Sequence, residues 1–226
     1  MTPTYRVLHR DETLLVVDKA PGVLTVGHPG SRERCLLDDL RRDGHKVAPV
    51  HRLDQQTSGV LLLSLDPAQR EALEQAFRRH EVDKRYLALV EGVPPARRAT
   101  IDVPIADEGK TARVDRAGRR AVTRYEVLET LGGRASLVRA HPESGRHNQI
   151  QIHFAHIGHP LLGDRKYGRR DSRARRAGPP APRVMLHAEA LALRHPATGR
   201  TLEVEAPLPE DFAALLRSLR AEGRGG

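Results

Sequence analysis

Apolar residues gather in short runs along the chain, and the spacing within each run predicts a strand or a helix. The run Val60–Leu65 is almost continuously apolar, which is typical of a strand buried on both faces. Asp66 and Pro67 follow, and they mark a helix start, because Asp caps helix N-termini and Pro suits the first helical position. Helical spacing of apolar residues then continues to Phe77.

Further segments have the short apolar pattern of strands, namely residues 14–17, 85–90, 122–128, 135–140, 188–193 and 201–204. Gly132 and Gly133 predict a hairpin between two of them. Apolar spacing predicts a helix over 147–157 and an amphipathic helix near the C-terminus. Strands dominate, so we expect an α+β fold with a largely antiparallel mixed sheet and flanking helices.

The length of 226 residues allows one sizeable core. We expect a single domain over residues 1–220 and a disordered tail over 221–226. The segment 168–183 is rich in Arg and Pro. Its composition is typical of a loop, which either contacts a polyanion, is partly disordered, or has no binding role.

The chain is strongly basic, with a formal net charge of +9 and a pI near 10.4. Of its 38 cationic residues, 33 are Arg and five are Lys. Arg binds phosphate through a planar fork, which favours a polyanionic partner, although a GC-rich genome would give the same bias. A single Cys excludes an intrachain disulfide and favours a cytoplasmic location. The absence of a long apolar run predicts no membrane span.

One carboxylate, Asp54, stands beside the cation Arg52 just before the predicted buried strand. By residue type alone, an Asp at this place caps a turn or pairs structurally with the Arg. A cation close to a carboxyl also keeps it ionised at neutral pH, as a nucleophile or a general base requires. Both interpretations are open on this pattern.

Several motifs decide between them. His51-Arg52-Leu53-Asp54 with Thr57-Ser58-Gly59 resembles the HRLDxxTSG signature of the RluA family of pseudouridine synthases. Further matches follow the order of the family, namely Asp18-Lys19-Ala20-Pro21-Gly22, Lys84-Arg85-Tyr86, Ser144-Gly145-Arg146, His159-Pro160-Leu161-Leu162-Gly163-Asp164 and Met185-Leu186-His187-Ala188. The matches begin near the N-terminus, so we expect a stand-alone catalytic domain without an S4 RNA-binding domain.

The resemblance implies a pseudouridine synthase fold with a central basic cleft. It implies an enzyme that flips a uridine out of structured RNA, either rRNA or tRNA, and converts it to pseudouridine. It implies no cofactor and no metal. We expect a cytoplasmic protein that works as a monomer.

The resemblance also assigns roles to residues. It implies that Asp54 is the catalytic carboxylate and that Tyr86 is a second catalytic residue that stacks on the uracil. The alternative for Tyr86 is a half-buried core tyrosine, the usual fate of Tyr in strands. The substrate-binding residues that the resemblance implies are Arg52, Arg146, Gln151 and Leu186.

Two positions depart from the family pattern. Asn148 stands where the family has His, and Gln151 stands where the family has an Arg that pairs with the catalytic Asp. Gln can donate a hydrogen bond to a carboxylate but brings no charge. An alternative function follows, an RNA-binding homologue with weak or no catalysis.

Three histidines, His153, His156 and His159, are spaced by three residues. That spacing raises a third hypothesis, a metal-dependent hydrolase. Positions i, i+3 and i+6 drift around a helix axis, Gly158 interrupts the pattern, and no Cys joins the set. We therefore expect no metal here.

Overall fold

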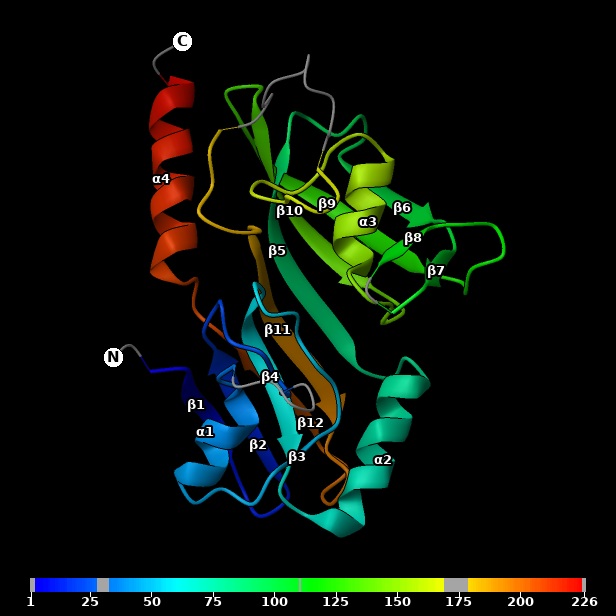
Figure 1. The fold of residues 1–226 in the computed structure, drawn as a ribbon, viewed down its shortest axis with the longest axis vertical. Coiled ribbons are helices and arrows are strands. Elements are labelled where there is room, and N and C mark those ends of the chain that lie inside the picture. Colours follow the sequence, from blue (N-terminus) through cyan, green and yellow to red (C-terminus); the bar gives the residue numbers. More distant parts are fainter. Residues whose placement is uncertain (1–2, 28–32, 110, 169–178, 225–226) are drawn as a thin grey trace. The chain divides into compact units, whose positions relative to one another are not determined.

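The computed structural model describes residues 3–27, 33–109, 111–168 and 179–224. The chain forms two compact units (Figure 1). Unit 1 comprises Met1–Lys84 and His187–Pro209, and unit 2 comprises Arg85–Leu186 and Glu210–Gly226. Each unit therefore combines segments that are far apart in the sequence.

Unit 1 is built on a sheet of mixed direction. Its main strands, in spatial order, are β1 (Tyr5–Arg10), β2 (Leu14–Lys19), β4 (Ser58–Ser64), β11 (Leu186–Arg194) and β12 (Thr201–Glu205). The short strand β3 (Ala48–Pro49) also pairs with β4. These pairs are antiparallel except β4 with β11, which run parallel. Gly59 (φ +109°) allows that pairing, because a Cβ there would lie 2.1 Å from the carbonyl oxygen of Ala188.

Strand β4 forms the centre of unit 1, and every one of its residues is buried. Val60 and Leu62 pack with Leu73 of helix α2 (Pro67–Arg78) in one apolar cluster. Side chains alternate along a strand, so Leu61, which is also fully buried, faces the opposite side of the sheet. Helix α1 (Leu36–Arg42) adds three buried leucines to unit 1. This rigid strand positions the loop that precedes it.

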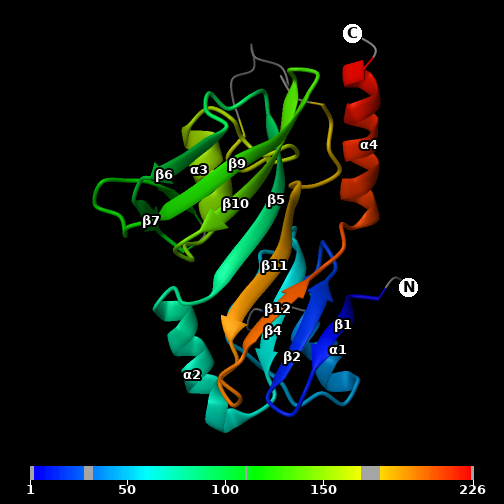
Figure 2. The same ribbon diagram turned by 180° about the vertical axis from the view of Figure 1, so that it is seen from behind.

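Unit 2 contains an antiparallel sheet in the order β5 (Asp83–Glu91), β10 (Ala135–Pro142), β9 (Val122–Leu131) and β6 (Arg98–Asp102). Helix α3 (Gln149–His156) covers one face of it, in front of the sheet in Figure 1 and behind it in Figure 2. A two-stranded ribbon, β7 (Ile105–Asp107) with β8 (Ala112–Val114), lies next to α3. Helix α4 (Glu210–Arg224) packs near β9.

The predicted α+β class with a largely antiparallel mixed sheet and flanking helices is confirmed. The hairpin of β9 and β10 and the helix α2 form where the sequence predicts them, and Asp66 caps α2 by accepting a hydrogen bond from the Ala68 N–H. No helix in the described ranges is long and apolar enough to cross a membrane. The central basic cleft stays a prediction.

The C-terminal end differs from the expectation. Helix α4 continues to Arg224, whereas the sequence predicted a disordered tail from residue 221; residues 225–226 lie outside the described residues. Arg220 explains part of the difference, because its guanidinium binds Glu129 of β9 through Nε and Nη2, at 3.0 and 2.7 Å. That ion pair holds the last turns of the helix.

Candidate active site

The loop of residues 50–57 connects β3 to β4 and carries Arg52 and Asp54. Asp54 is half-buried and Arg52 is exposed, while Leu53 between them is 4% exposed. The Asp54 carbonyl oxygen accepts a hydrogen bond of 3.0 Å from the Thr57 N–H, which closes a turn. The loop is thus anchored by one apolar side chain and presents two charged ones.

A single hydroxyl holds the residue before Asp54. Thr25 Oγ1 donates to the Leu53 carbonyl oxygen at 2.8 Å and accepts from the Leu53 N–H at 3.2 Å. Thr25 is 3% exposed, so water does not compete for these bonds. Both backbone groups of Leu53 are therefore satisfied by one buried side chain.

A buried lysine holds the residue after Asp54. Lys19 is 0% exposed, and its ammonium donates to the carbonyl oxygens of Ala20, Val23 and Gln55, at 2.9, 2.9 and 3.3 Å. The N–H of Gly22 (φ +81°) also donates to the Gln55 carbonyl oxygen, at 2.8 Å. Carbonyl oxygens that converge on one ammonium compensate the cost of burying its charge. The backbone on both sides of Asp54 is fixed in this way.

His51 begins the same loop and has a structural role. Its Nε2 accepts a hydrogen bond of 2.9 Å from the Leu62 N–H of β4, and its ring stacks on Phe77 with centroids 4.4 Å apart. Burial, with a smaller contribution from the charge of Lys84, lowers the pKa of His51 to about 3. His51 is therefore neutral at physiological pH and serves as an acceptor for the strand.

Strand β5 carries Lys84 and Tyr86, two residues apart and hence on the same face. Burial lowers the pKa of Lys84 to about 8. Tyr86 is half-buried and packs against an apolar cluster of unit 2 that includes Val138 and Leu186. Leu186 itself is 4% exposed at the start of β11. This packing is consistent with both interpretations of Tyr86, a core tyrosine and a ring that leaves one face available to stack on uracil.

Gln149 organises the start of α3. Its Oε1 accepts hydrogen bonds from Ser144 Oγ (2.6 Å) and the Arg146 N–H (3.0 Å). Its Nε2 donates to the Val122 carbonyl oxygen (2.9 Å) and to Thr123 Oγ1 (3.0 Å). All the hydrogen-bonding capacity of the amide nitrogen is used. The sequence alone did not predict this buried network, which joins residues up to 27 positions apart.

The two residues that depart from the family both contact one segment. Gln151 is 6% exposed, and its Nε2 donates to Asp164 Oδ2 at 3.0 Å. Asn148, in the left-handed region (φ +51°), donates through Nδ2 to the Tyr167 hydroxyl at 3.0 Å. Asp164 Oδ1 in turn accepts from the N–H groups of Lys166 and Tyr167. These residues therefore tie α3 to the segment 164–167, a role that the sequence did not predict.

Arg146 lies half-buried just before α3, and its Nε donates to the Arg120 carbonyl oxygen at 3.1 Å. Burial and the like charge of Arg119 lower the pKa of Arg146. A guanidinium next to a second cation favours the approach of an anion. Of the predicted site residues, Arg146 and Gln151 thus lie close together around the start of α3. Arg52 and Asp54 lie in the loop between β3 and β4.

Part of the Arg- and Pro-rich segment predicted as a loop over 168–183 falls on residues 169–178, outside the described residues. Its described end, residues 179–183, lies outside any helix or strand, as predicted for a loop, but Arg183 is buried. The Arg183 side chain is 5% exposed, and it binds Asp211 of α4 through Nε (2.6 Å) and Nη2 (3.0 Å). Its Nη1 also donates to the Leu186 carbonyl oxygen. Arg183 therefore belongs to the packing of unit 2.

Within the described ranges, no group of three His, Cys, Asp or Glu side chains could hold a metal ion. Two of the three spaced histidines have protein partners. His153 bonds to Thr123 Oγ1 (2.9 Å) and the Val103 carbonyl oxygen (3.1 Å), and burial lowers its pKa. His159 bonds to the Glu91 carbonyl oxygen at 2.8 Å. These contacts account for both side chains as structural groups.

Comparison with known proteins gives one consistent result. The family model described as RNA pseudouridylate synthase matches residues 13–156. The dual-specificity RNA pseudouridine synthase RluA of Escherichia coli K12 is 35% identical over 91% of this chain and 94% of its own length. An uncharacterized RNA pseudouridine synthase of Mycobacterium bovis is 38% identical over 96% of this chain and 73% of its own length.

Solved structures agree with the sequence matches. The human RNA pseudouridylate synthase domain containing 4 superposes with a TM-score of 0.76 and 27% identity, over 95% of this chain and 92% of the other. The human RNA pseudouridylate synthase domain containing 1 gives a TM-score of 0.74 and 28% identity, over 98% of both chains.

Proposed function

Because this chain belongs to the RluA family of RNA pseudouridine synthases, we propose that Asp54 is the carboxylate that converts uridine to pseudouridine in RNA. The reaction breaks the bond between uracil N1 and ribose C1′. The uracil turns and rejoins C1′ through C5, so C5 loses a proton and N1 gains one. The reaction is an isomerisation and consumes no other reactant.

Asp54 suits either of two roles at the ribose. It attacks C1′ as a nucleophile, or it removes the proton from C2′ as a general base. In both cases positive charge develops near C1′ as the N1 bond breaks. A carboxylate that is already in place stabilises this charge without reorganisation.

The observation that carries the proposal is the double anchoring of the loop around Asp54. The carbonyl of Gln55 and both backbone groups of Leu53 bond to Lys19, Gly22 and Thr25 in the way described above. A loop held by hydrogen bonds at the residues before and after a carboxylate limits the movement of that carboxylate, as catalysis demands. A turn-capping Asp alone would not require this support.

We assign the other site residues to RNA recognition. Arg52, exposed next to Asp54, occupies the space that the flipped base leaves, where a guanidinium stacks and donates hydrogen bonds. Tyr86 stacks on the extruded uracil and takes part in its proton transfer. Arg146 binds a phosphate, Leu186 lines the base pocket, and Gln151 acts indirectly, by tying α3 to the segment 164–167 through its bond to Asp164.

The substrate in this proposal is structured RNA, either rRNA or tRNA, and the protein acts as a cytoplasmic monomer. One relative carries the name of a dual-specificity enzyme, so both RNA classes belong in the test. The net charge of +9 favours binding to either class.

The test has two parts. Purified protein is incubated with RNA that carries tritium at uridine C5, and tritium released to water measures turnover. Pseudouridine is then mapped in rRNA and tRNA from cells with and without the gene. Release of tritium together with a site that disappears without the gene supports the proposal. Tight RNA binding without release would instead indicate the alternative, a homologue that binds RNA and does not catalyse.

A further inference from the structure

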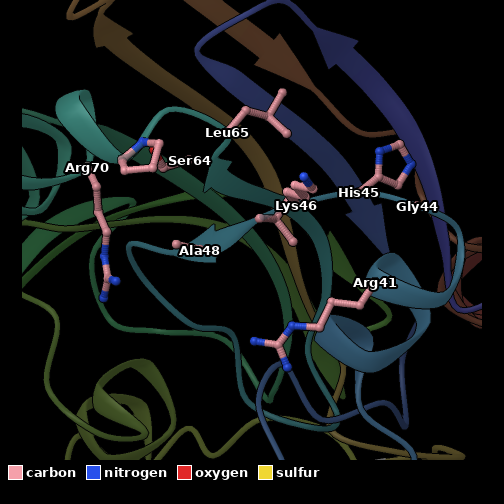
Figure 3. A pocket seen from close by; sticks show the side chains of 10 residues that line it. Arg41, Gly44, His45, Lys46, Ala48, Ser64, Leu65 and Arg70 are labelled. Carbon is pink, nitrogen blue, oxygen red and sulfur yellow. The ribbon is translucent and has the colours of Figure 1, made fainter.

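A basic pocket lies at the far end of β4 from Asp54. It encloses about 530 Å³, and its lining includes Arg41, His45, Lys46 and Arg70. Arg41 comes from α1, Lys46 from the connection between α1 and β3, and Arg70 from α2 (Figure 3). No carboxylate is among the described residues that line it. Two helices and the connection between α1 and β3 thus supply cations to one pocket.

The cations differ in how far the protein neutralises them. Lys46 is exposed and makes no hydrogen bond or ion pair with the part of the chain that the structure describes. Arg70 uses its Nε on Glu74 at 2.8 Å and keeps a side-chain exposure of 49%. Arg41 lies 3.5 Å from Asp38, with both side chains 59% exposed. Ion pairs this exposed are weak, so the pocket keeps much of its positive charge.

The N-terminus of α2 contributes little to the positive charge of the pocket. Asp66 caps α2, and its Oδ1 accepts a 2.9 Å hydrogen bond from the Ala68 N–H. Figure 3 shows the side chains of Arg41 and Arg70 on either side of Ala48 in β3. The attraction for an anion therefore comes from side chains that can close on it from two sides.

Strand β4 gives the distance to the catalytic loop. Its seven residues run from Ser58, four positions after Asp54, to Ser64 in the pocket lining. At about 3.3 Å per residue, the two ends of the strand lie about 20 Å apart. Phosphates along one strand of a duplex are spaced by about 3.4 Å of axis. A duplex bound at Asp54 therefore spans this distance with about six base pairs, and an unpaired strand, which extends further per nucleotide, spans it with fewer nucleotides.

We propose that the pocket lined by Arg41, Lys46 and Arg70 binds a backbone phosphate of the substrate RNA, at about the length of β4, ~20 Å, from the loop that carries Asp54. The inference rests on the proposed function, because Asp54 marks where the target nucleotide binds. It adds a second anchor that holds RNA outside the base pocket. Phosphate contacts of this kind carry no sequence information and fix the register of the RNA.

The experiment measures RNA binding as a function of salt. The variants are Lys46→Gln, Arg70→Gln and the double variant, and the probe is a labelled oligouridylate of about 20 nucleotides. Each lost phosphate contact reduces the slope of log affinity against log salt by about 0.7 to 1. Because the pocket binds one phosphate, we expect a partial reduction in each single variant and the full reduction of one contact in the double variant.

Arg78→Gln is the matched control. Arg78 lies on α2, pairs with the same Glu74 as Arg70, at 3.4 Å, and has a side-chain exposure of 61%, but it does not line the pocket. Its salt slope should equal that of the wild type. Equal slopes in the wild type and both pocket variants, or an equal loss in Arg78→Gln, would overturn the proposal.

Two further probes separate the possible sources of phosphate. A uridine dinucleotide is too short to reach the pocket from Asp54, so its affinity should be the same in all variants. Inorganic phosphate, followed by calorimetry, tests a free anion. Loss of phosphate binding in the pocket variants with an unchanged oligouridylate slope would assign the pocket to a small anion and reject the RNA contact.

The binding readout is independent of turnover. Asp54→Asn protein should show the same oligouridylate slope as the wild type and the same dependence on Lys46. In protein that keeps Asp54, a normal pocket effect without any tritium release would reject the proposed function and keep the pocket. Normal tritium release with no effect of the pocket variants on the salt slope would reject the pocket proposal and keep the proposed function.

Discussion

Thr25 Oγ1 bonds to both backbone groups of Leu53, donating to the carbonyl oxygen at 2.8 Å and accepting from the N–H at 3.2 Å. The two residues are 28 positions apart in the sequence, and Leu53 directly precedes Asp54. One hydroxyl thereby sets the direction in which the chain enters the candidate catalytic residue. Thr25 is a positioning residue in this account, since it acts through the loop.

Thr25→Val keeps the shape of the side chain and removes the hydroxyl. It leaves a buried N–H and a buried carbonyl without their partner, which costs about 1–3 kcal/mol of unfolding free energy. We also expect kcat to fall with little change in KM, because the loop loosens around Asp54. Thr25→Ser restores the hydroxyl and should restore kcat. A Ser variant as slow as the Val variant would contradict the positioning role.

His51 predicts a dependence of stability on pH. Its pKa is about 3 in the folded protein, whereas the ordinary value is 6.5. Below pH 6.5 the unfolded chain therefore binds a proton at His51 that the folded chain does not bind. Stability therefore falls as the pH drops from about 6.5 towards 3, by up to about 1.4 kcal/mol per pH unit from this residue.

The measurement is urea unfolding of the wild type and His51→Gln between pH 4.5 and 7.5. Gln keeps an acceptor for the Leu62 N–H but does not titrate in this range. The wild type should lose stability more steeply below pH 6.5 than the variant. Parallel curves for the two proteins would show that His51 is not held neutral in the folded protein.

Gln151→Leu tests the bond to Asp164. The bond is buried, and its loss leaves the carboxylate oxygen Oδ2 without this donor, so we expect a cost of about 1–3 kcal/mol in unfolding free energy. Gln75→Leu is the matched control, because Gln75 donates to Glu71 at 3.2 Å on the exposed face of α2. That change should cost less than about 0.5 kcal/mol. Equal costs for both would remove the argument that Gln151 has a buried structural role.

Elements with a continuous or strictly periodic apolar pattern could be predicted from the sequence. Strand β4 is buried on both faces, and α2 repeats its apolar residues at helical spacing. Strand β1 was missed because it is an edge strand with no buried residue, so burial imposes no alternation on Tyr5–Arg10. Helix α1 was missed because seven residues are too few for a clear period.

The candidate site could likewise be predicted only in part. Asp54 could be found from its motif, but the contacts that hold it could not. Lys19 belongs to a residue type that is almost never fully buried, and its burial depends on carbonyl oxygens collected by a turn and by Gln55, 36 positions away. The bond of Gln151 to Asp164 likewise depends on how the chain turns after α3.

Tritium release from RNA labelled at uridine C5 measures whether Asp54 performs the reaction. Asp54→Asn keeps the shape of the side chain and removes its negative charge. Glu12→Gln makes the same change at an exposed carboxylate of unit 1. We expect wild-type release from Glu12→Gln and a loss of at least about 10³-fold for Asp54→Asn, with both proteins folded. Release by Asp54→Asn at the wild-type rate would contradict this role of Asp54.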